Sequence, residues 1–280
     1  MAEPKHAERD DDDDADQRPE DDVEMTFFEH LGELRTRLIR ALIAMVPGLV
    51  IGWYFHEELM GLLLRPFLSA TTKMGMPPEL VFTDPTDAFF WYLVVAMIAA
   101  LLFALPVIFW QLWGFISPGL YRREKRMAFP FVFASTALFA AGVYFCYAVV
   151  LEPTFMLFFS FAGEVGDSGV AFESLTAIDR YLALATRLLV AFGVTFEVPV
   201  VVTFLALVGL VNWKQLLKFG RWWLVISSVV AAVLTPPDMA TMLFMMVPLN
   251  ALYWLGVVLA AIVGPKPAPK SGVTTDGYER

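Results

Sequence analysis

Residues 87–116, DAFFWYLVVAMIAALLFALPVIFWQLWGFI, form an almost unbroken apolar stretch that decides the class of fold. A helix needs roughly 20 apolar residues to cross about 30 Å of hydrocarbon, so this stretch is long enough to span a membrane. Comparable stretches lie on both sides of it, at residues 38–55, 128–152, 179–208, 222–235 and 239–263. The sequence therefore predicts an all-α, polytopic membrane protein with six transmembrane helices.

The stretch 222–235 is short for a span. Its 14 residues, bounded by Arg221 and the Pro236-Pro237-Asp238 turn, would cover only about 21 Å as a helix. Either the helix includes flanking residues, or the bilayer is locally thinned around it. The sequence leaves both alternatives open.

The composition agrees with a membrane protein, since 58% of the residues are hydrophobic and only 18% are charged. The net charge of −9 equals that of residues 1–24, which hold twelve acids and three bases. Such an acidic run has nothing to bury and is expected to be disordered. We expect an acidic tail over 1–24, a six-helix domain over 25–264 and a flexible cytoplasmic tail over 265–280.

Lysine and arginine residues in the connections predict the orientation. With the amino terminus inside, twelve of them lie on the cytoplasmic side, against Arg65, Lys73 and the boundary residue Arg180 on the other. Both termini are therefore predicted to be cytoplasmic. The longer connections, 56–86 and 153–178, then face outward, and their apolar residues suggest interfacial helices.

Acidic residues at the predicted cytoplasmic edge are candidates for recognition. Glu29, Glu33 and Arg37 follow one another at helical i, i+4 spacing, just after a possible capping box formed by Thr26 and Glu29. The simplest interpretation of Glu33 and Arg37 is an ordinary helix pair. In the connection 115–126, Glu124 is a single acid among four bases. It is a candidate for recognition, but its simplest interpretation is local neutralisation of those bases.

Two further acids lie in or near the apolar stretches. Glu197 falls inside the fourth span, where a carboxylate is costly and is a functional candidate by default. It could make an interhelical contact, touch a substrate or partner, or relay protons. Asp238 most simply caps the last helix.

Catalytic and metal-binding patterns are not evident. The sequence has no His-Glu-x-x-His pair, no Gly-x-Ser-x-Gly elbow and no phosphate-binding glycine loop. We therefore predict no enzymatic activity, no cofactor, no metal and no nucleic-acid partner.

Four strings, in order along residues 26–263, resemble the TatC family, the multispanning signal-peptide receptor subunit of the twin-arginine (Sec-independent) protein translocase. They are HLGELRTRL (30–38), PVI through QLWGFISPGLY (106–121), AFGVTFEVP (191–199) and LTPPD (234–238). The six-span plan with both ends inside agrees with this resemblance. A glycine at position 32 and Met242, where some members carry glutamine, depart from the family pattern.

The resemblance implies a receptor that recognises peptides and does not catalyse a reaction. A receptor of this kind binds twin-arginine signal peptides of folded proteins at its cytoplasmic face, recruits single-span TatA/TatB-type subunits, and works with the protonmotive force. Self-association within the complex and a location in the bacterial or archaeal cytoplasmic membrane are also expected. By position, the resemblance implies signal-peptide binding by Glu33, Glu124, Phe115, Arg35 and Arg37, partner or intramembrane polar contacts at Glu197, Thr235 and Asp238, and structural loop roles for Pro66, Pro236 and Pro237.

The main competing interpretation is a proton-coupled small-solute transporter that uses Glu197. It would place several charges around a midplane cavity, often with repeat symmetry. Here only Arg187 and Glu197 lie at membrane depth, whereas Glu33 and Glu124 lie at the cytoplasmic edge.

Overall fold

The computed structural model describes residues 27–77, 80–82, 84–116, 128–161, 163–164, 171–172, 176–235 and 239–264. The two predicted tails, 1–24 and 265–280, lie outside these residues. The helices are α1 (Phe27–Tyr54), α2 (His56–Lys73), α3 (Asp87–Ile116), α4 (Ala128–Phe145), α5 (Leu151–Phe159), α6 (Ile178–Thr195), α7 (Val198–Leu207), α8 (Trp213–Leu234) and α9 (Met239–Val263).

The prediction of an all-α membrane protein is confirmed. Within the described residues, five helical segments are long and apolar enough to cross a membrane, and the pair α1 and α2, bent by 79°, brings the number to six. The helices α3 and α9 begin and end at the residues that the sequence indicates. The first helix begins at Phe27, directly after the acidic tail, as the Thr26 and Glu29 pattern predicts, and eleven residues before its apolar stretch.

The short fifth span includes flanking residues. Helix α8 begins at Trp213 and has 22 residues, which gives a length of about 33 Å. Its start is fixed by a capping box, in which Asn212 accepts from the backbone and Gln215 accepts from the Asn212 amide. The apolar stretch alone therefore underestimates the helix, because three basic residues lie in its first turns.

Two of the spans are interrupted. A π-helical turn at Cys146–Val150 joins α4 to α5, and Phe196 and Glu197 separate α6 from α7. Pro199 lies in the first turn of α7, where its missing N–H costs little, and it prevents α6 from continuing unbroken. The break places the Glu197 backbone at the start of α7.

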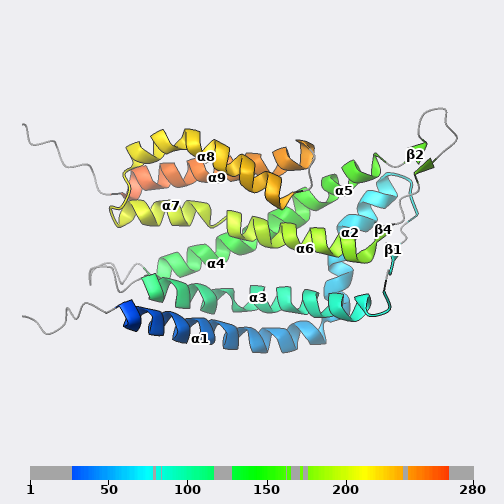
Figure 1. Cartoon of the computed structure of the whole chain (residues 1–280), viewed down its shortest axis with the longest axis horizontal. Coiled ribbons are helices and arrows are strands. Elements are labelled where there is room, and N and C mark those ends of the chain that lie inside the picture. The colour runs from blue at the N-terminus through cyan, green and yellow to red at the C-terminus, as the bar shows by residue number, and fades with distance from the viewer. Residues whose placement is uncertain are drawn as a thin grey trace, which may run out of the picture.

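The helix ends fall into two groups (Figure 1). The start of α1, the end of α3, the start of α4, the α7–α8 connection and the end of α9 lie together at one end. This is the predicted cytoplasmic end, where most of the basic connections are found. At the other end, β1 (Leu80–Val81) pairs in parallel with β4 (Thr176–Ala177), and β2 (Gly163–Glu164) pairs antiparallel with β3 (Ala171–Phe172).

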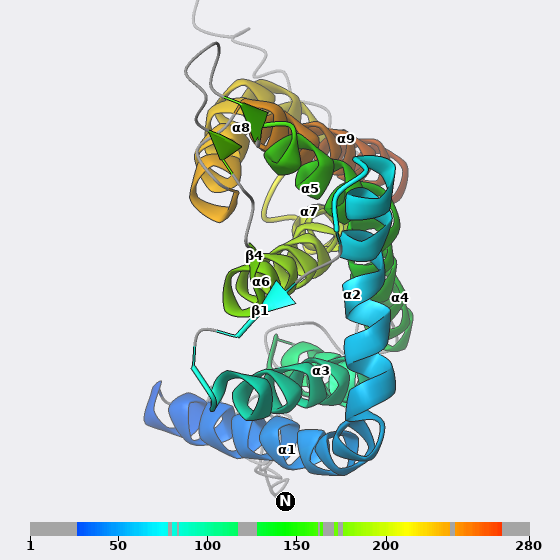
Figure 2. The same ribbon diagram turned by 90° about the vertical axis from the view of Figure 1, so that its right-hand side faces the viewer.

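The helices form a curved arrangement (Figure 2). Helices α1 and α3 lie at one side, α8 and α9 at the other, and α6 lies between them, while α2 runs along the edge. The main core joins α2, α5 and α6 and includes Phe67, Phe155 and Leu182, whose side chains are at most 4% exposed. Two smaller clusters join α3 to α4 and α7, and α7 to α8 and α9.

Glycines let α1 pack closely along α3. A Cβ at Gly52 would lie 2.7 Å from the Ala96 carbonyl oxygen, and one at Gly48 would lie 2.9 Å from the Ala100 Cα. Small residues of this kind let helix backbones approach in a membrane, where van der Waals packing drives association. The seam formed by Gly48, Gly52, Ala96 and Ala100 therefore fixes α1 on α3.

The leucine stripe of α1 does not pack against the rest of the described chain. Leu31, Leu34, Leu38 and Leu42 are all more than 40% exposed. The spacing of these leucines predicts one helical stripe, which lies either on the membrane surface or against other helices. Their exposure shows that the other described helices leave about half of each side chain uncovered, which favours the first alternative or a contact with another subunit.

Pro66, for which the family resemblance implies a structural role in a loop, lies instead inside helix α2 and is buried. Proline has no N–H, so the carbonyl of Leu62, four residues earlier, loses its usual partner. The Tyr147 hydroxyl donates to that carbonyl at 3.0 Å, and the Tyr181 hydroxyl donates to the Leu63 carbonyl at 2.6 Å. Two tyrosines therefore anchor α2 where its backbone pairing is interrupted.

We expect Tyr181→Phe to lower the free energy of unfolding by about 1–3 kcal/mol, because it leaves the buried Leu63 carbonyl without this donor. Tyr181 is only 1% exposed, so water cannot replace the bond. Denaturation of the purified protein in detergent measures the effect. Tyr144→Phe is the matched control, because Tyr144 is 71% exposed. Equal stability of the two variants would contradict the anchoring role.

Candidate functional site

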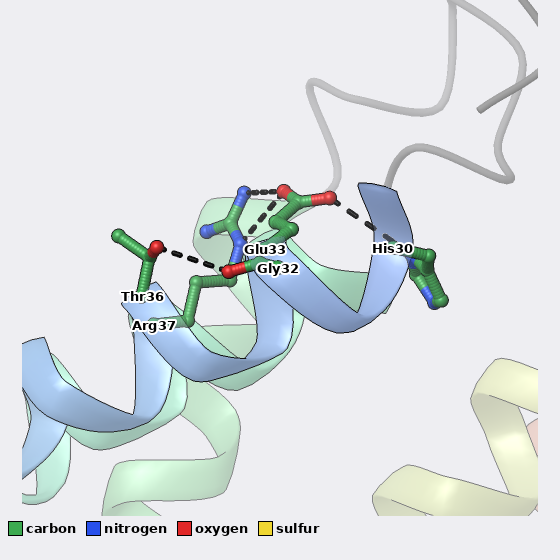
Figure 3. A network of polar contacts seen from close by, with 5 residues as sticks. All are labelled: His30, Gly32, Glu33, Thr36 and Arg37. Atoms are coloured by element: carbon green, nitrogen blue, oxygen red, sulfur yellow. Dashed lines mark hydrogen bonds and ion pairs between the residues drawn. The ribbon is translucent and has the colours of Figure 1, made fainter. Parts of the chain in front are cut away.

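Glu33 and Arg37 form an ion pair near the start of α1 (Figure 3). Arg37 donates to Glu33 Oε1 from Nε at 2.8 Å and from Nη2 at 2.6 Å. Their side chains are only 21% and 22% exposed, respectively. The spacing predicted this pair, and the structure adds that both bonds converge on one carboxylate oxygen.

The second oxygen of Glu33 is held differently. Oε2 is buried and accepts no hydrogen bond from any described residue. The His30 Nδ1 atom lies 3.9 Å from Oε2, beyond hydrogen-bond distance. A carboxylate has about four lone-pair sites, so Glu33 retains the capacity to accept further donors. The carboxylate is thus oriented by Arg37 and incompletely satisfied.

Phe115 joins this site from α3. Its ring stacks on His30, with centroids 4.2 Å apart and planes 17° apart. The contact brings the last turn of α3 against the first turn of α1. Phe115 and Glu33, which the sequence could only associate through the family resemblance, therefore belong to one cluster.

Gly114 makes room for the Arg37 guanidinium. A Cβ at position 114 would lie 2.2 Å from Arg37 Nη1, so only glycine leaves this space open. Neither the sequence motifs nor the periodicity identified this role. Gly114 occurs within the QLWGF string, but a contact between two helices cannot be inferred from one of them.

Two further residues, Arg35 and Glu124, are expected from the resemblance to bind the signal peptide. Arg35 is exposed on α1 and makes no ion pair within the described parts of the chain. Glu124 lies in the connection 117–127, outside the described residues. This connection begins directly after Ile116, the last residue of α3, and so starts beside Phe115.

Glu197 lies among polar groups of α3 and α4. The Ser135 hydroxyl is its hydrogen-bond partner, and Trp113 Nε1 donates to the same hydroxyl at 3.3 Å. Ser135 is fully buried. The arrangement is the interhelical contact that was one of the alternatives for Glu197, while its Oε1 accepts no hydrogen bond from any described residue.

The other candidate residues either form a hydrogen bond within their own helix or lie outside the described residues. Thr235 is buried and donates to the Ala231 carbonyl at 2.7 Å, which satisfies its hydroxyl within α8. Pro236, Pro237 and Asp238 lie outside the described residues, so the capping role expected for Asp238 stays a prediction. Among the described residues, no group of three or more His, Cys, Asp or Glu side chains could hold a metal ion.

The sequence matches one known family over most of its length. The family model described as Sec-independent protein translocase protein (TatC) matches residues 29–248. The chain belongs to the TatC family. This TatC-family chain is therefore a subunit of the Sec-independent protein translocase and a multi-pass protein of the cytoplasmic membrane. The family is a translocase component, in agreement with the absence of catalytic motifs from the sequence.

Curated TatC relatives are similar over nearly their whole length. The protein of Desulforapulum autotrophicum is 38% identical over 257 residues, which cover 89% of this chain and 92% of the relative. That of Deinococcus radiodurans is 37% identical over 254 residues, covering 88% and 92%. That of Koribacter versatilis is 33% identical over 256 residues, covering 91% and 92%.

Solved TatC structures have the same fold. The crystal structure of a twin-arginine translocase receptor, TatC, in the detergent DDM superposes with a TM-score of 0.71 at 33% identity, covering 83% of this chain and 99% of that one. A second crystal structure of this receptor gives a TM-score of 0.68 at 34% identity, covering 84% and 99%. The six-span membrane architecture is thus shared with experimentally determined TatC proteins.

Proposed function

We propose that this translocase subunit binds the twin-arginine signal peptides of folded proteins at its cytoplasmic end. The observation that carries the proposal is the Glu33 carboxylate, which Arg37 orients through Oε1 while Oε2 accepts no bond from the described residues. A signal arginine would donate to Oε2, and Glu124 would accept the second arginine.

The chemistry favours arginine over lysine. A guanidinium is planar and presents five donors in a fixed fork, whereas an ammonium is a compact, strongly hydrated charge. The half-buried position of Glu33 strengthens this difference, because hydrogen bonds gain strength as water is excluded. Phe115 adds an aromatic ring next to His30, and a guanidinium can stack on that ring once His30 moves aside.

Neighbouring charges oppose non-specific attraction. Arg35, Arg37 and Arg40 on α1 and the four bases of residues 122–126 would repel a basic peptide. The acidic residues 1–24 would attract basic peptides, but they act equally on lysine and arginine, so long-range Coulomb forces cannot select arginine. Selection rests on the geometry of individual hydrogen bonds, which a pair of lysines does not reproduce.

The proposed function also includes recruitment of single-span TatA/TatB-type subunits and export driven by the protonmotive force. The exposed leucine stripe of α1 and the polar cluster around Glu197 support helix contacts within such a complex. Self-association of the chain belongs to the same proposal.

The test is binding of a synthetic twin-arginine signal peptide, carrying a photocrosslinker, to the full-length protein in lipid nanodiscs. A twin-lysine version is the control. The proposal predicts that the twin-arginine peptide crosslinks to α1 near Glu33 and to the 117–127 connection, and that the twin-lysine peptide binds more weakly. A folded, inserted protein that ignores both peptides would show that the proposed function is wrong.

Gly114→Ala is expected to weaken twin-arginine peptide binding by about threefold to tenfold, the value of up to one neutral hydrogen bond. The new methyl group displaces the flexible Arg37 guanidinium, so Glu33 loses its orientation while the fold is kept. Peptide titration measures the effect. Gly32→Ala is the matched control, because a Cβ there meets nothing within 4 Å. Equal affinity of both variants would contradict an orienting role for Arg37.

A further inference from the structure

Trp113 lies in the last turn of α3 and donates its indole N–H to the Ser135 hydroxyl of α4. Ser135 is in turn the hydrogen-bond partner of Glu197. An indole can only donate, so the oxygen of Ser135 must accept from it. A serine hydroxyl has a single proton, and this arrangement leaves that proton free to point at the carboxyl group. Trp113 therefore sets the direction in which Ser135 donates.

The Ser135 hydroxyl has another acceptor within its own helix. A serine or threonine inside a helix commonly donates to the carbonyl four residues earlier. The next residue, Thr136, does so to the Val132 carbonyl at 2.8 Å. Without the indole, the Ser135 proton can therefore turn back to the carbonyl of Phe131 and away from Glu197.

Glu197 has few partners that could replace Ser135. Its Oε1 is buried and accepts no hydrogen bond from any described residue. The described residues of α4 and α7 include no charged side chain, and no lysine or arginine of the described chain forms an ion pair with Glu197. A buried polar group without a partner is costly. The surroundings of this intramembrane acid therefore depend strongly on one hydroxyl group.

The turn that carries Trp113 also forms part of the candidate signal-peptide site. Gly114 contacts the Arg37 guanidinium, and Phe115 stacks on His30. Positions 113 and 115 point about 200° apart around the helix axis, so they lie on opposite faces of this turn. An arginine that replaces His30 on the Phe115 ring changes the packing of the turn, and this change also reaches its other face.

The bond between Trp113 and Ser135 is easily broken. Its length of 3.3 Å is above the usual range of about 2.7–3.2 Å, so a shift on the order of 0.3 Å would end it. The indole also contacts Phe131 of α4 and Phe204 of α7, with ring centroids 4.9 and 4.7 Å away. A displacement of this turn is thus passed to both helices that border Glu197.

We propose that Trp113 is a positioning residue, which directs the Ser135 proton to Glu197 while the signal-peptide site is empty and releases it when a peptide binds. The inference rests on the proposed signal-peptide binding and adds a route from that site to the intramembrane acid. When the last turn of α3 shifts, the indole N–H leaves Ser135 and the hydroxyl turns away. Glu197 is then available to another donor.

The first measurement is peptide affinity in the full-length protein in lipid nanodiscs. Because the bond between Trp113 and Ser135 exists only in the peptide-free form, its removal should tighten binding of a twin-arginine peptide by about twofold to tenfold, the value of one neutral hydrogen bond. Trp113→Phe and Ser135→Ala each remove it, and the double variant should gain nothing further. Trp110→Phe is the matched control, because Trp110 is exposed on the same helix, and it should leave the affinity unchanged.

The second measurement is infrared difference spectroscopy of the Glu197 carboxyl band, which Glu197→Gln identifies. The twin-arginine peptide should shift this band in the unaltered protein. In Trp113→Phe and Ser135→Ala the band should already be shifted without peptide, and peptide should change it no further. A merely structural role would weaken binding and would leave the response of the band intact.

Unchanged or weaker binding in both variants would overturn the inference, as would a band that still responds to peptide in Trp113→Phe. Ser135→Ala alone decides the question if Trp113→Phe does not fold, because it removes only one oxygen atom. A peptide that binds the unaltered protein without shifting the Glu197 band overturns the inference and leaves the proposed function standing. A peptide that does not bind at all shows that the proposed function is wrong, and the route with it.

Discussion

Glu33→Gln is expected to raise the dissociation constant of a twin-arginine peptide by about 10- to 150-fold, since hydrogen bonds to a charged group contribute about 1.5–3 kcal/mol. Glutamine keeps the shape of the side chain and removes its charge. The half-buried site cannot replace that charge with water, and Arg37 then repels the incoming guanidinium without compensation. Titration of a fluorescent peptide against the protein in nanodiscs measures the change.

The same variant should also lose selectivity. Because the fixed fork of arginine gains most from a carboxylate, the affinities for twin-arginine and twin-lysine peptides should converge in Glu33→Gln. Glu57→Gln is the control, since Glu57 is exposed in the first turn of α2, remote from the site. An unchanged ratio of affinities would place arginine recognition elsewhere, for example at Glu124 alone.

The largest effect on stability is expected from Gly52→Leu. Even a methyl group at this position would lie 2.7 Å from the Ala96 carbonyl and 3.1 Å from the Ala99 Cβ, and neither atom is the end of a flexible chain. Overpacking of this kind usually costs about 1–3 kcal/mol, and a leucine forces the two helices apart. We expect the midpoint of thermal unfolding in detergent to fall clearly below that of the unaltered protein.

Gly61 offers the matched control, because a Cβ there meets nothing within 4 Å. Gly61→Ala should be neutral or stabilising by up to about 1 kcal/mol, the difference in helix propensity. Gly52→Leu should also weaken peptide binding, although residue 52 lies about 28 Å along α1 from Glu33, because both act through the same α1–α3 contact. Normal stability of Gly52→Leu would show that α1 is not held by this seam.

The spans could be predicted because hydrocarbon thickness imposes a length and a composition on each helix. The limits of α3 and α9 followed directly from their apolar stretches. Helix α8 was underestimated, because Lys214, Lys218 and Arg221 interrupt the apolar pattern while a capping box still starts the helix at Trp213. The bend between α1 and α2 was not predicted, because nothing in hydropathy records the direction of a chain after it leaves the membrane.

The candidate site was predictable only in part. Spacing predicted the Glu33–Arg37 pair, since it lies within one helix. The stack of His30 on Phe115 and the space at Gly114 depend on how α1 meets α3, which one-dimensional periodicity does not contain. Glu197 was recognised as a costly intramembrane acid, but its partner Ser135 lies on another helix and looked like an ordinary small residue.

The packing of α1 has a consequence for the energetics of binding. Among the described elements, α1 packs chiefly along α3, with a small contact to α2, and shows its leucine stripe to the outside. A helix attached along one seam can open locally at a lower free energy than the helices of the main core. A ligand that touches both Glu33 and Phe115 binds only the closed form, so it shifts this opening equilibrium by mass action. Binding of the ligand therefore makes the whole of α1 more ordered. This effect can act as a signal without any change in the average structure.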